Sequence, residues 1–323
     1  MSFDRKKGGR MFKLGNITCN VGEKYSGFWK IDNYNIPVTV IYGKNKGKTI
    51  CISAGIHNCE YTSIQAAIDL ANEFTPENIN GILIILHTIN YSGFFKRVSR
   101  IVPEDNKNLN RVFPGDENGT ISEKIAFTFS KYLYPQLDFF IDVHGGDLFE
   151  EVIPFIYAPG IGEKEIIDFS HEVASNISLP IRVRSKASTG AYNSAAIQGI
   201  PALLIELGGN GNIKNENLIK YKKCLKEFLS YLEIIKYNSS EKIEQKEIIE
   251  AKYLESPCDG YWYPKFKAGD FIRKGDILGE IKDCFGNELY TFKAEFDGII
   301  LYQTISLAIP KDDPLVAYGK LDK

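Results

Sequence analysis

Two histidines and one glutamate occur where an open α/β sheet would present them to a ligand. His57 ends the apolar run KTICISAGIH (48–57), Glu60 follows three residues later, and His144 ends the core of DFFIDVHGG (138–146). Ligands bind such sheets outside the carboxyl ends of the strands. Two imidazoles and a carboxylate there form a zinc-ligand set that leaves a fourth position for water. A single strand-end histidine is more often structural, so the prediction rests on the three residues occurring together.

The other two of the four histidines do not fit a metal site. His87 lies in the strand-like run GILIILHTIN (81–90) without a nearby carboxylate, and we expect it to pack in the core or at a strand end. His171 lies beside the apolar row of a helical segment, and we expect it on the surface.

Glu206 interrupts the apolar run ALLIELGG (202–209) at the end of a predicted buried strand. A buried carboxylate is costly unless something uses it. Two interpretations remain open: a salt-bridged strand end, or a general base that faces an activated water.

The segment SRIVPEDNKNLNRVFPG (99–115) carries two arginines, Arg100 and Arg111, and Asn110 stands beside the second. A planar guanidinium next to an amide suits bidentate recognition of a carboxylate. From these residues alone, arginines of an ordinary surface loop remain the alternative.

The elements that must position these residues alternate along the chain. Apolar runs predict strands at 36–43, 48–57, 81–90, 138–146 and 202–209, and apolar periodicity predicts helices at 60–74, 122–134, 163–177 and 217–235. This alternation predicts an α/β fold whose mixed, mainly parallel sheet is flanked by helices.

The sequence changes character after Tyr237. Residues 238–249 are polar and resemble a linker, and the remainder alternates short strand-like runs with Asp-Gly and Lys-Gly-Asp turns. We therefore predict a catalytic α/β domain at 1–240 and a small all-β sandwich module at 250–323. Its expected core is Trp262, Phe266, Phe271, Ile277, Leu278, Ile299 and Leu301.

Composition excludes several function classes. Hydrophobic residues make up 44% and charged residues 25% of the chain, and the net charge is −2. These values argue against nucleic-acid and membrane-surface partners. The six cysteines show no CxxC pair, and no apolar run follows the basic N-terminal residues, so we expect a cytoplasmic protein with reduced thiols. A homo-oligomer stays open.

Four segments in this order resemble the succinylglutamate desuccinylase/aspartoacylase family of zinc-carboxypeptidase-like hydrolases. They are GIHNCE (55–60), RIVPEDNKNLNRVFPG (100–115), DVHGG (142–146) and GIPALLIELGG (199–209). The resemblance covers roughly residues 35–235 and implies one Zn²⁺ per chain, held by His57, Glu60 and His144.

The same resemblance implies the remaining roles. Glu206 matches the general acid/base, and Arg100 matches the arginine that polarises the scissile carbonyl. Asn110 and Arg111 match the pair that grips the substrate carboxylate.

Two departures from the family pattern matter. Cys59 adds a sulfur near the expected metal, and segment 186–201 lacks the arginine that many members carry before the catalytic glutamate. We expect Tyr192, with Asn193, to bind substrate in its place.

The C-terminal module resembles a biotinyl/lipoyl-like barrel-sandwich hybrid. The turn DCFGNELYT (283–291) has no lysine where a carrier would display one, so we predict a structural role.

These observations predict a zinc-dependent amidohydrolase, a deacylase that acts on a small N-acyl amino acid or a related carboxylate-bearing amide. The first alternative is a zinc metallocarboxypeptidase that trims peptide C-termini. The second is a non-catalytic binding protein that keeps the metal fold, against which Glu206 and Arg100 argue.

Overall fold

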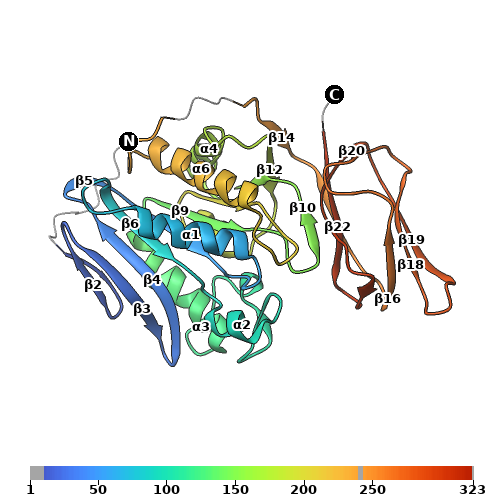
Figure 1. Cartoon of the computed structure of the whole chain (residues 1–323), viewed down its shortest axis with the longest axis horizontal. Helices are drawn as coiled ribbons and strands as arrows, with labels where there is room; N and C mark the ends of the chain where they lie inside the picture. The colour runs from blue at the N-terminus through green and yellow to red at the C-terminus, as the bar shows by residue number, and fades with distance from the viewer. Residues whose placement is uncertain (1–10, 239–242, 322–323) are drawn as a thin grey trace.

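A mixed sheet of nine strands forms the centre of the computed structural model, which describes residues 11–238 and 243–321 (Figure 1). The strand order is β14-β12-β11-β13-β9-β5-β6-β4-β3. The pairs β13–β9, β9–β5 and β5–β6 at its centre are parallel, and β4 and β3 are antiparallel additions. The strands are β3 (Lys24–Ile31), β4 (Tyr34–Tyr42), β5 (Asn45–Ala54), β6 (Asn80–Leu86), β9 (Phe139–His144), β11 (Phe155–Pro159), β12 (Ile181–Ser185), β13 (Ala202–Glu206) and β14 (Lys246–Ile248).

The predicted α/β fold with a mainly parallel sheet is confirmed. Every residue of β9 is buried, as expected of a strand covered on both faces. The helices are α1 (Tyr61–Glu73), α2 (Tyr91–Lys96), α3 (Ile121–Thr128), α4 (Lys164–Ala174), α5 (Ala191–Ile197) and α6 (Asn215–Tyr231). A π-helical turn, Phe129–Leu133, continues α3, and single 3₁₀ turns cover Leu109–Arg111 and Tyr134–Gln136.

The two faces of the sheet carry different helices because strand side chains alternate. Ile141 and Val143 of β9 pack in one core cluster with α1, α4 and α6, which lie together on one face in Figure 1. Phe140 of β9 and Leu204 of β13 pack in the other cluster with α3 and α5. Asp142, His144 and Glu206 continue this second row, so their side chains leave the sheet on the α5 side.

The first strands of the structure were not expected from the sequence. β1 (Met11–Leu14) and β2 (Ile17–Asn20) form an antiparallel hairpin, and β7 (Ile101–Val102) and β8 (Lys107–Asn108) form a second, shorter one. The first hairpin, together with Trp29 of β3, closes the α3-side core. The second shapes the loop that carries Arg100.

The C-terminal strands form two sheets that face each other across one core. Trp262, Leu278, Ile281 and Tyr318 are buried between them. One sheet has the order β19-β18-β16-β21, and the other has β20, β22 and β15 with β17 at its side. Their bounds are β15 (Ala251–Glu255), β16 (Gly260–Pro264), β17 (Phe271–Ile272), β18 (Ile277–Lys282), β19 (Glu288–Lys293), β20 (Gly298–Thr304), β21 (Ala308–Ile309) and β22 (Pro314–Lys320). We call these strands the C-terminal module.

A strand from the catalytic region joins the module. β10 (Glu150–Val152), which follows the His144 loop, pairs antiparallel with β20, with Val152 opposite Tyr302 (Figure 1). A separate apolar cluster connects Phe155 of β11 to Leu301 of β20. The module is therefore joined to the catalytic region by both a hydrogen-bonded ladder and an apolar contact.

Two expectations about this region were wrong. Lys246–Ile248, expected in a linker, form β14 at the edge of the nine-stranded sheet; of the remaining linker, residues 239–242 lie outside the described part of the chain, as do residues 1–10. In the module, Phe271 is 73% exposed and Ile277 is 40% exposed, so neither belongs to the core. Both lie at strand positions that face solvent, which apolarity alone does not reveal. Among the residues that the structure describes, no helix is both long and apolar enough to cross a membrane.

The contact between module and catalytic region predicts a stability effect. Leu301 is fully buried in the cluster with Phe155, so Leu301→Ala should lower the free energy of unfolding by about 2 to 4 kcal/mol. Leu289→Ala on β19, where the side chain is about half exposed, should change it by less than about 1 kcal/mol. Urea unfolding measures both, and equal effects would show that Leu301 does not fasten the module.

Candidate metal centre and active site

His57, Glu60 and His144 come together as one buried group. A ligand atom from each lies within 4.8 Å of the others. The Glu60 carboxylate lies between the rings, 2.8 Å from Nδ1 of His57 and 3.0 Å from Nδ1 of His144. His57 and Glu60 lie in the turn between β5 and α1, and His144 is the last residue of β9, the strand next to β5. The structure thus joins the three predicted ligands.

A second carboxylate orients one ligand. Asp142 is fully buried and lies 2.9 Å from Nε2 of His144, while the hydroxyl of Ser53 donates to its other oxygen at 2.9 Å. A hydrogen bond to the far ring nitrogen fixes the orientation of a ligating imidazole. The side chain of Asp142 therefore leaves Nδ1 of His144 directed at Glu60.

The donor set fits a divalent metal ion. Burial alone would lower the pKa of His144, but the carboxylates of Glu60 and Asp142 raise it well above its usual range. The negative charges that hold a proton on this buried imidazole also favour a bound cation at the same place. Two imidazole nitrogens and a carboxylate suit zinc, which prefers nitrogen and oxygen donors in three-ligand catalytic sites.

Glu206 lies beside this group. It pairs in register with His144 across the parallel β13–β9 ladder, so both side chains leave the same face of the sheet. Its carboxylate makes no hydrogen bond or ion pair with a described residue. Burial raises its pKa well above the ordinary value; His144 opposes this effect, and the charges of Glu60, Glu150 and Asp142 add to it. The salt-bridge interpretation of Glu206 finds no partner among the described residues.

Arg100 is held by two carboxylates. Its Nε lies 2.7 Å from Asp147, and its Nη2 lies 3.1 Å from Asp313 of the module. Asp147 also accepts hydrogen bonds from Ser99 and from Sγ of Cys59, the residue before Glu60. The structure thus places Arg100 next to the His57–Glu60 turn, with its charge already balanced.

Asn110 and Arg111 lie at the end of the same loop. The side-chain oxygen of Asn110 accepts the backbone N–H of Ala191 at 2.9 Å, which fixes the start of α5. Arg111 is exposed, and no described carboxylate lies within ion-pair distance of it. Burial raises the pKa of Tyr302 in the module, and the charge of Arg111 opposes this rise.

Tyr192 is buried on α5 and belongs to a group of four tyrosines. Tyr157 stacks against Tyr192 with ring centroids 6.5 Å apart. The ring centroids of Tyr253 and Tyr302, both in the module, lie 6.5 Å apart. Burial raises the pKa of Tyr157, Tyr192 and Tyr302, and the charge of Glu206 raises it further in each case. These four tyrosines come from α5, β11 and the C-terminal module.

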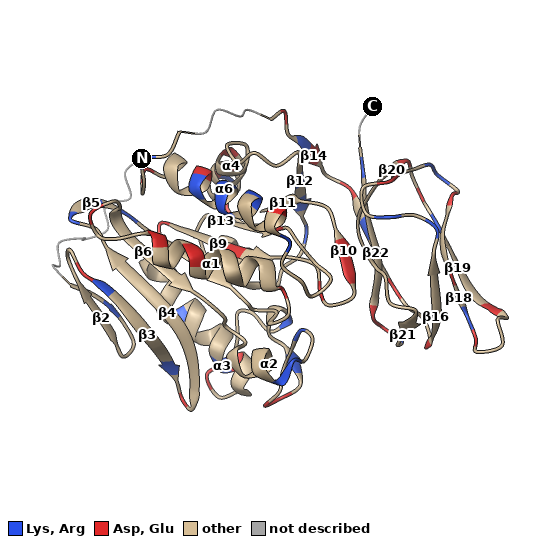
Figure 2. Cartoon of the chain, in the orientation of Figure 1, with Lys and Arg blue, Asp and Glu red and all other residues tan. Residues whose placement is uncertain are grey.

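Glu150 is a site residue that sequence reasoning missed. It opens β10, and its Oε2 accepts the backbone N–H of Asp147 at 3.3 Å. Burial and the charge of Asp147 raise its pKa to about 7, although Arg100 opposes this effect. Figure 2 shows the acidic residues of β10 beside the module. A signal was present, because an acidic residue shortly after the HGG motif lies close to a predicted ligand.

Asp313, Tyr253 and Tyr302 were missed for a different reason. They come from the module, more than a hundred residues after His144 in the sequence. No local pattern indicates which module residues meet Arg100, so nothing in the sequence could have found them.

Three other expectations can be compared with the structure. The Sγ of Cys59 donates a hydrogen bond to Oδ1 of Asp147 at 3.0 Å, and Cys59 does not join the metal-ligand group. His87 bonds to Thr39 at 2.8 Å, as expected of a packed strand-end residue. His171 was expected on the surface, and this was wrong: it is buried, and its Nε2 lies 3.0 Å from the carbonyl oxygen of Pro159. The end of β11 packs against the side of α4 that carries His171, a side that the apolar periodicity of the helix did not mark as buried.

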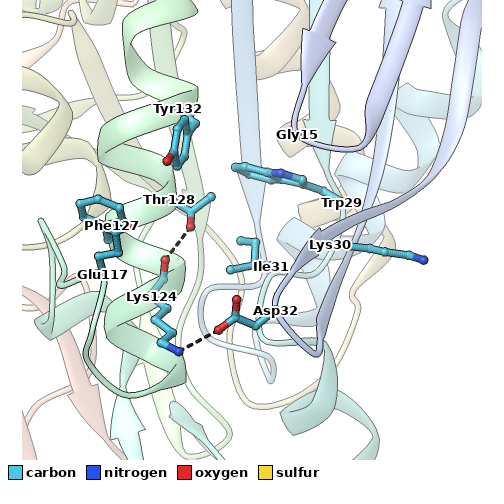
Figure 3. Close-up of a pocket in the computed structure, with 10 residues that line it drawn as sticks. All are labelled: Gly15, Trp29, Lys30, Ile31, Asp32, Glu117, Lys124, Phe127, Thr128 and Tyr132. Carbon is cyan, nitrogen blue, oxygen red and sulfur yellow. Dashed lines mark hydrogen bonds and ion pairs between the residues drawn. The ribbon is translucent and has the colours of Figure 1, made fainter.

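A separate cavity of about 370 Å³ lies between β3 and α3 (Figure 3). Its polar lining includes the ion pair of Lys124 with Asp32, 2.8 Å apart. The cavity shares no residue with the His57–Glu60–His144 group and contains none of the predicted site residues, so we assign the chemistry elsewhere.

Comparison with known proteins agrees with this arrangement. A model of the succinylglutamate desuccinylase/aspartoacylase catalytic domain matches residues 46–232. The N-alpha-acetyl-L-2,4-diaminobutyric acid deacetylase of Halomonas elongata is 26% identical over 295 residues, which span 88% of this chain and 86% of that protein.

Solved structures extend the similarity over the module. The product-bound ectoine utilization protein EutE (DoeB) from Ruegeria pomeroyi is 25% identical, with a TM-score of 0.83 over 97% of this chain and 99% of that one. A succinylglutamate desuccinylase from Silicibacter sp. TM1040 is also 25% identical, with a TM-score of 0.81 over 98% of this chain and 100% of that one.

The role of Asp142 can be tested through metal affinity. Asp142→Asn should weaken metal binding roughly 10- to 100-fold, because the amide orients His144 less firmly and adds no charge. Titration against a competing chelator measures the constant. Asp69→Asn, which breaks an ion pair with Lys222 on the α1–α6 surface, is the control. An unchanged affinity in Asp142→Asn would contradict the role.

The raised pKa of Glu150 predicts a pH-dependent stability. A carboxyl whose pKa rises from its ordinary value to about 7 on folding destabilises the fold above pH 7 but not below about pH 4.5. Burial is the largest cause of the shift, the charges of Asp147 and Glu60 add to it, and Arg100 opposes it. Glu150→Gln should therefore raise the Tm of the metal-free protein at pH 8 and leave it unchanged near pH 4.5. An equal shift at both pH values would refute the assignment.

Proposed function

The chain belongs to the succinylglutamate desuccinylase/aspartoacylase family, and from this premise we propose that it is a zinc-dependent deacylase of small N-acyl amino acids. The observation that carries the proposal is the placement of Glu206. It lies in register with His144, beside three ligand atoms within 4.8 Å of one another, and its carboxylate has no hydrogen bond or ion pair with a described residue. The deacetylase from Halomonas elongata supports amide hydrolysis of a small substrate. All six cysteines are free, and we place the enzyme in the cytoplasm.

The residues divide the chemistry between them. His57, Glu60 and His144 would hold zinc, whose Lewis acidity activates water and polarises a carbonyl group. Glu206 takes the proton of the attacking water on a carboxylate oxygen and passes it to the leaving nitrogen. Its raised pKa suits both transfers, because a general acid/base works best near the operating pH.

The arginines bind the substrate. Arg111, with the amide of Asn110, grips the substrate carboxylate, and Tyr192 forms part of the opposite wall. Arg100 stabilises negative charge on the carbonyl oxygen through Nη1, which has no described partner, while Asp147 and Asp313 hold its other nitrogens.

The module favours a deacylase over a carboxypeptidase. Asp313 of the module contacts Arg100, and β10, which follows the His144 loop, pairs with β20, so the module lies beside the site. A confined site of this kind suits a small substrate. Assays on N-acetyl amino acids and on dipeptides, with and without chelator, compare the two activities, and faster cleavage of dipeptides would favour the carboxypeptidase.

Glu206→Gln tests the assignment of the general base. The substitution keeps the shape of the side chain and removes its proton affinity, so turnover of the zinc-loaded enzyme should fall about 100-fold or more. Zinc content, measured by mass spectrometry of the native protein, should stay at one ion per chain. Turnover within about twofold of the parent enzyme would show that Glu206 is not the base.

A further inference from the structure

The loop that carries Arg100 has an unusual backbone conformation. Arg100 has a φ of 54°, in the left-handed region, and so does Arg97 at the end of α2, with a φ of 55°. The N–H of Ile101 donates to the carbonyl oxygen of Ser99 at 2.5 Å, which closes a tight turn around Arg100. A residue other than glycine keeps such a conformation only where surrounding contacts enforce it. Contacts from outside the loop must therefore hold Arg100 in this turn.

Two buried asparagines, Asn58 and Asn90, supply these contacts, and we call them the amide pair. The side-chain nitrogen of Asn58 donates to the carbonyl oxygen of Val98, and that of Asn90 donates to the carbonyl oxygen of Ile101 at 2.7 Å. Asn90 also donates to Oδ1 of Asn58 at 2.8 Å, which joins the two amides. Their exposed fractions are 1% and 0%, so the loss of one of these bonds would leave a buried polar group unsatisfied. The amide pair therefore grips the loop backbone on both sides of Arg100.

The amide pair is itself fixed to the strand that leads to the metal ligands. The backbone N–H of Asn90 donates to the carbonyl oxygen of Gly55, directly after β5, at 2.8 Å. Asn58 lies in the turn after the same strand, between His57 and Glu60. The backbone around Arg100 is thus tied to the turn that carries two of the three candidate ligands.

We propose that Asn58 is a positioning residue for Arg100 and acts through the amide pair. The proposal rests on the deacylase function proposed above and adds the residue that places its arginine. Asp147 and Asp313 hold the guanidinium group, which is only the far end of a flexible side chain. The amide pair holds the near end, the backbone of Arg100, so that both ends are fixed. Placement matters because a shift of about 1 Å in a reacting or stabilising group can lower a rate about 100-fold.

Asn58→Ala in the full-length, zinc-loaded enzyme tests the proposal on the substrate that the parent enzyme cleaves fastest. We expect kcat to fall about tenfold or more and KM to stay within about threefold, because the misplaced group acts in the transition state. Asn45→Ala is the matched control. The amide of Asn45 also donates to an asparagine, Asn80, at 3.1 Å, but on the surface, so its loss should leave both constants unchanged. An unchanged kcat in Asn58→Ala, or an equal loss in Asn45→Ala, would overturn the proposal.

A double-mutant cycle with Arg100→Gln separates positioning from a general structural effect. In the Arg100→Gln background, Asn58→Ala should lower kcat by less than about twofold, because the group that Asn58 positions is absent. A loss of similar size in both backgrounds would mean that Asn58 supports the fold or the metal-ligand turn directly, and would refute the proposal. Asn58→Asp keeps the acceptor for Asn90 and removes the donor to Val98. It replaces Asn58→Ala if that variant does not fold, and the same outcomes decide.

Hydrogen exchange followed by mass spectrometry tests the contact without turnover. Asn58→Ala should speed exchange in residues 98–102 about tenfold or more and leave β9 unchanged, because only the loop loses its anchor. If no substrate is hydrolysed, the deacylase proposal fails, and hydrogen exchange alone still decides whether the amide pair holds the backbone of Arg100. Unchanged exchange in residues 98–102, or an equal acceleration in β9, would contradict the role of Asn58.

Discussion

The in-register pairing of β9 with β5 and β13 is the constraint on which the site depends. The pairing places Asp142 beside Ser53, and His144 beside Glu206, all on the α5 side of the sheet. Glu60 then needs only the short turn after β5 to bridge both imidazoles. A shift of one residue in either ladder would send these side chains into the apolar cluster under α1 and α6. The surrounding apolar residues of β9 therefore also maintain the geometry of the polar ones.

A second strand pairing, between β10 and β20, positions the module relative to the site. β10 continues the chain from the His144 loop and pairs with β20, so the two carboxylates at the loop, Asp147 and Glu150, are positioned relative to module residues by a backbone ladder. Asp313 shares Arg100 with Asp147 across the same junction. One region therefore supplies the candidate metal-ligand group and Glu206, and both regions supply the carboxylates around Arg100.

The sequence predicts the part of this arrangement that depends on short segments. Central strands such as β6 contain continuous apolar runs, and the predicted metal-ligand residues stand in loops or at strand ends within a few residues of such runs. What depends on contacts between distant segments could not be predicted. His171 is buried because β11 covers it, and Phe271 is exposed because its sheet turns that position outward. Tyr302 lies opposite Val152 only because β10 and β20 pair. The family follows from the order of the motifs and the fold from the alternation of predicted strands and helices, whereas the charge balance around Arg100 depends on a contact with the distant Asp313.

The central claim is that His57, Glu60 and His144 form a zinc site with Glu206 beside it. Crystals of the zinc-loaded protein, with anomalous diffraction recorded on both sides of the zinc absorption edge, test it most directly. The account predicts one anomalous peak per chain, about 2.0 to 2.3 Å from Nδ1 of His57, Nδ1 of His144 and a carboxylate oxygen of Glu60. A peak at Cys59, at Asp147 or at any position that leaves these three side chains without metal would contradict it.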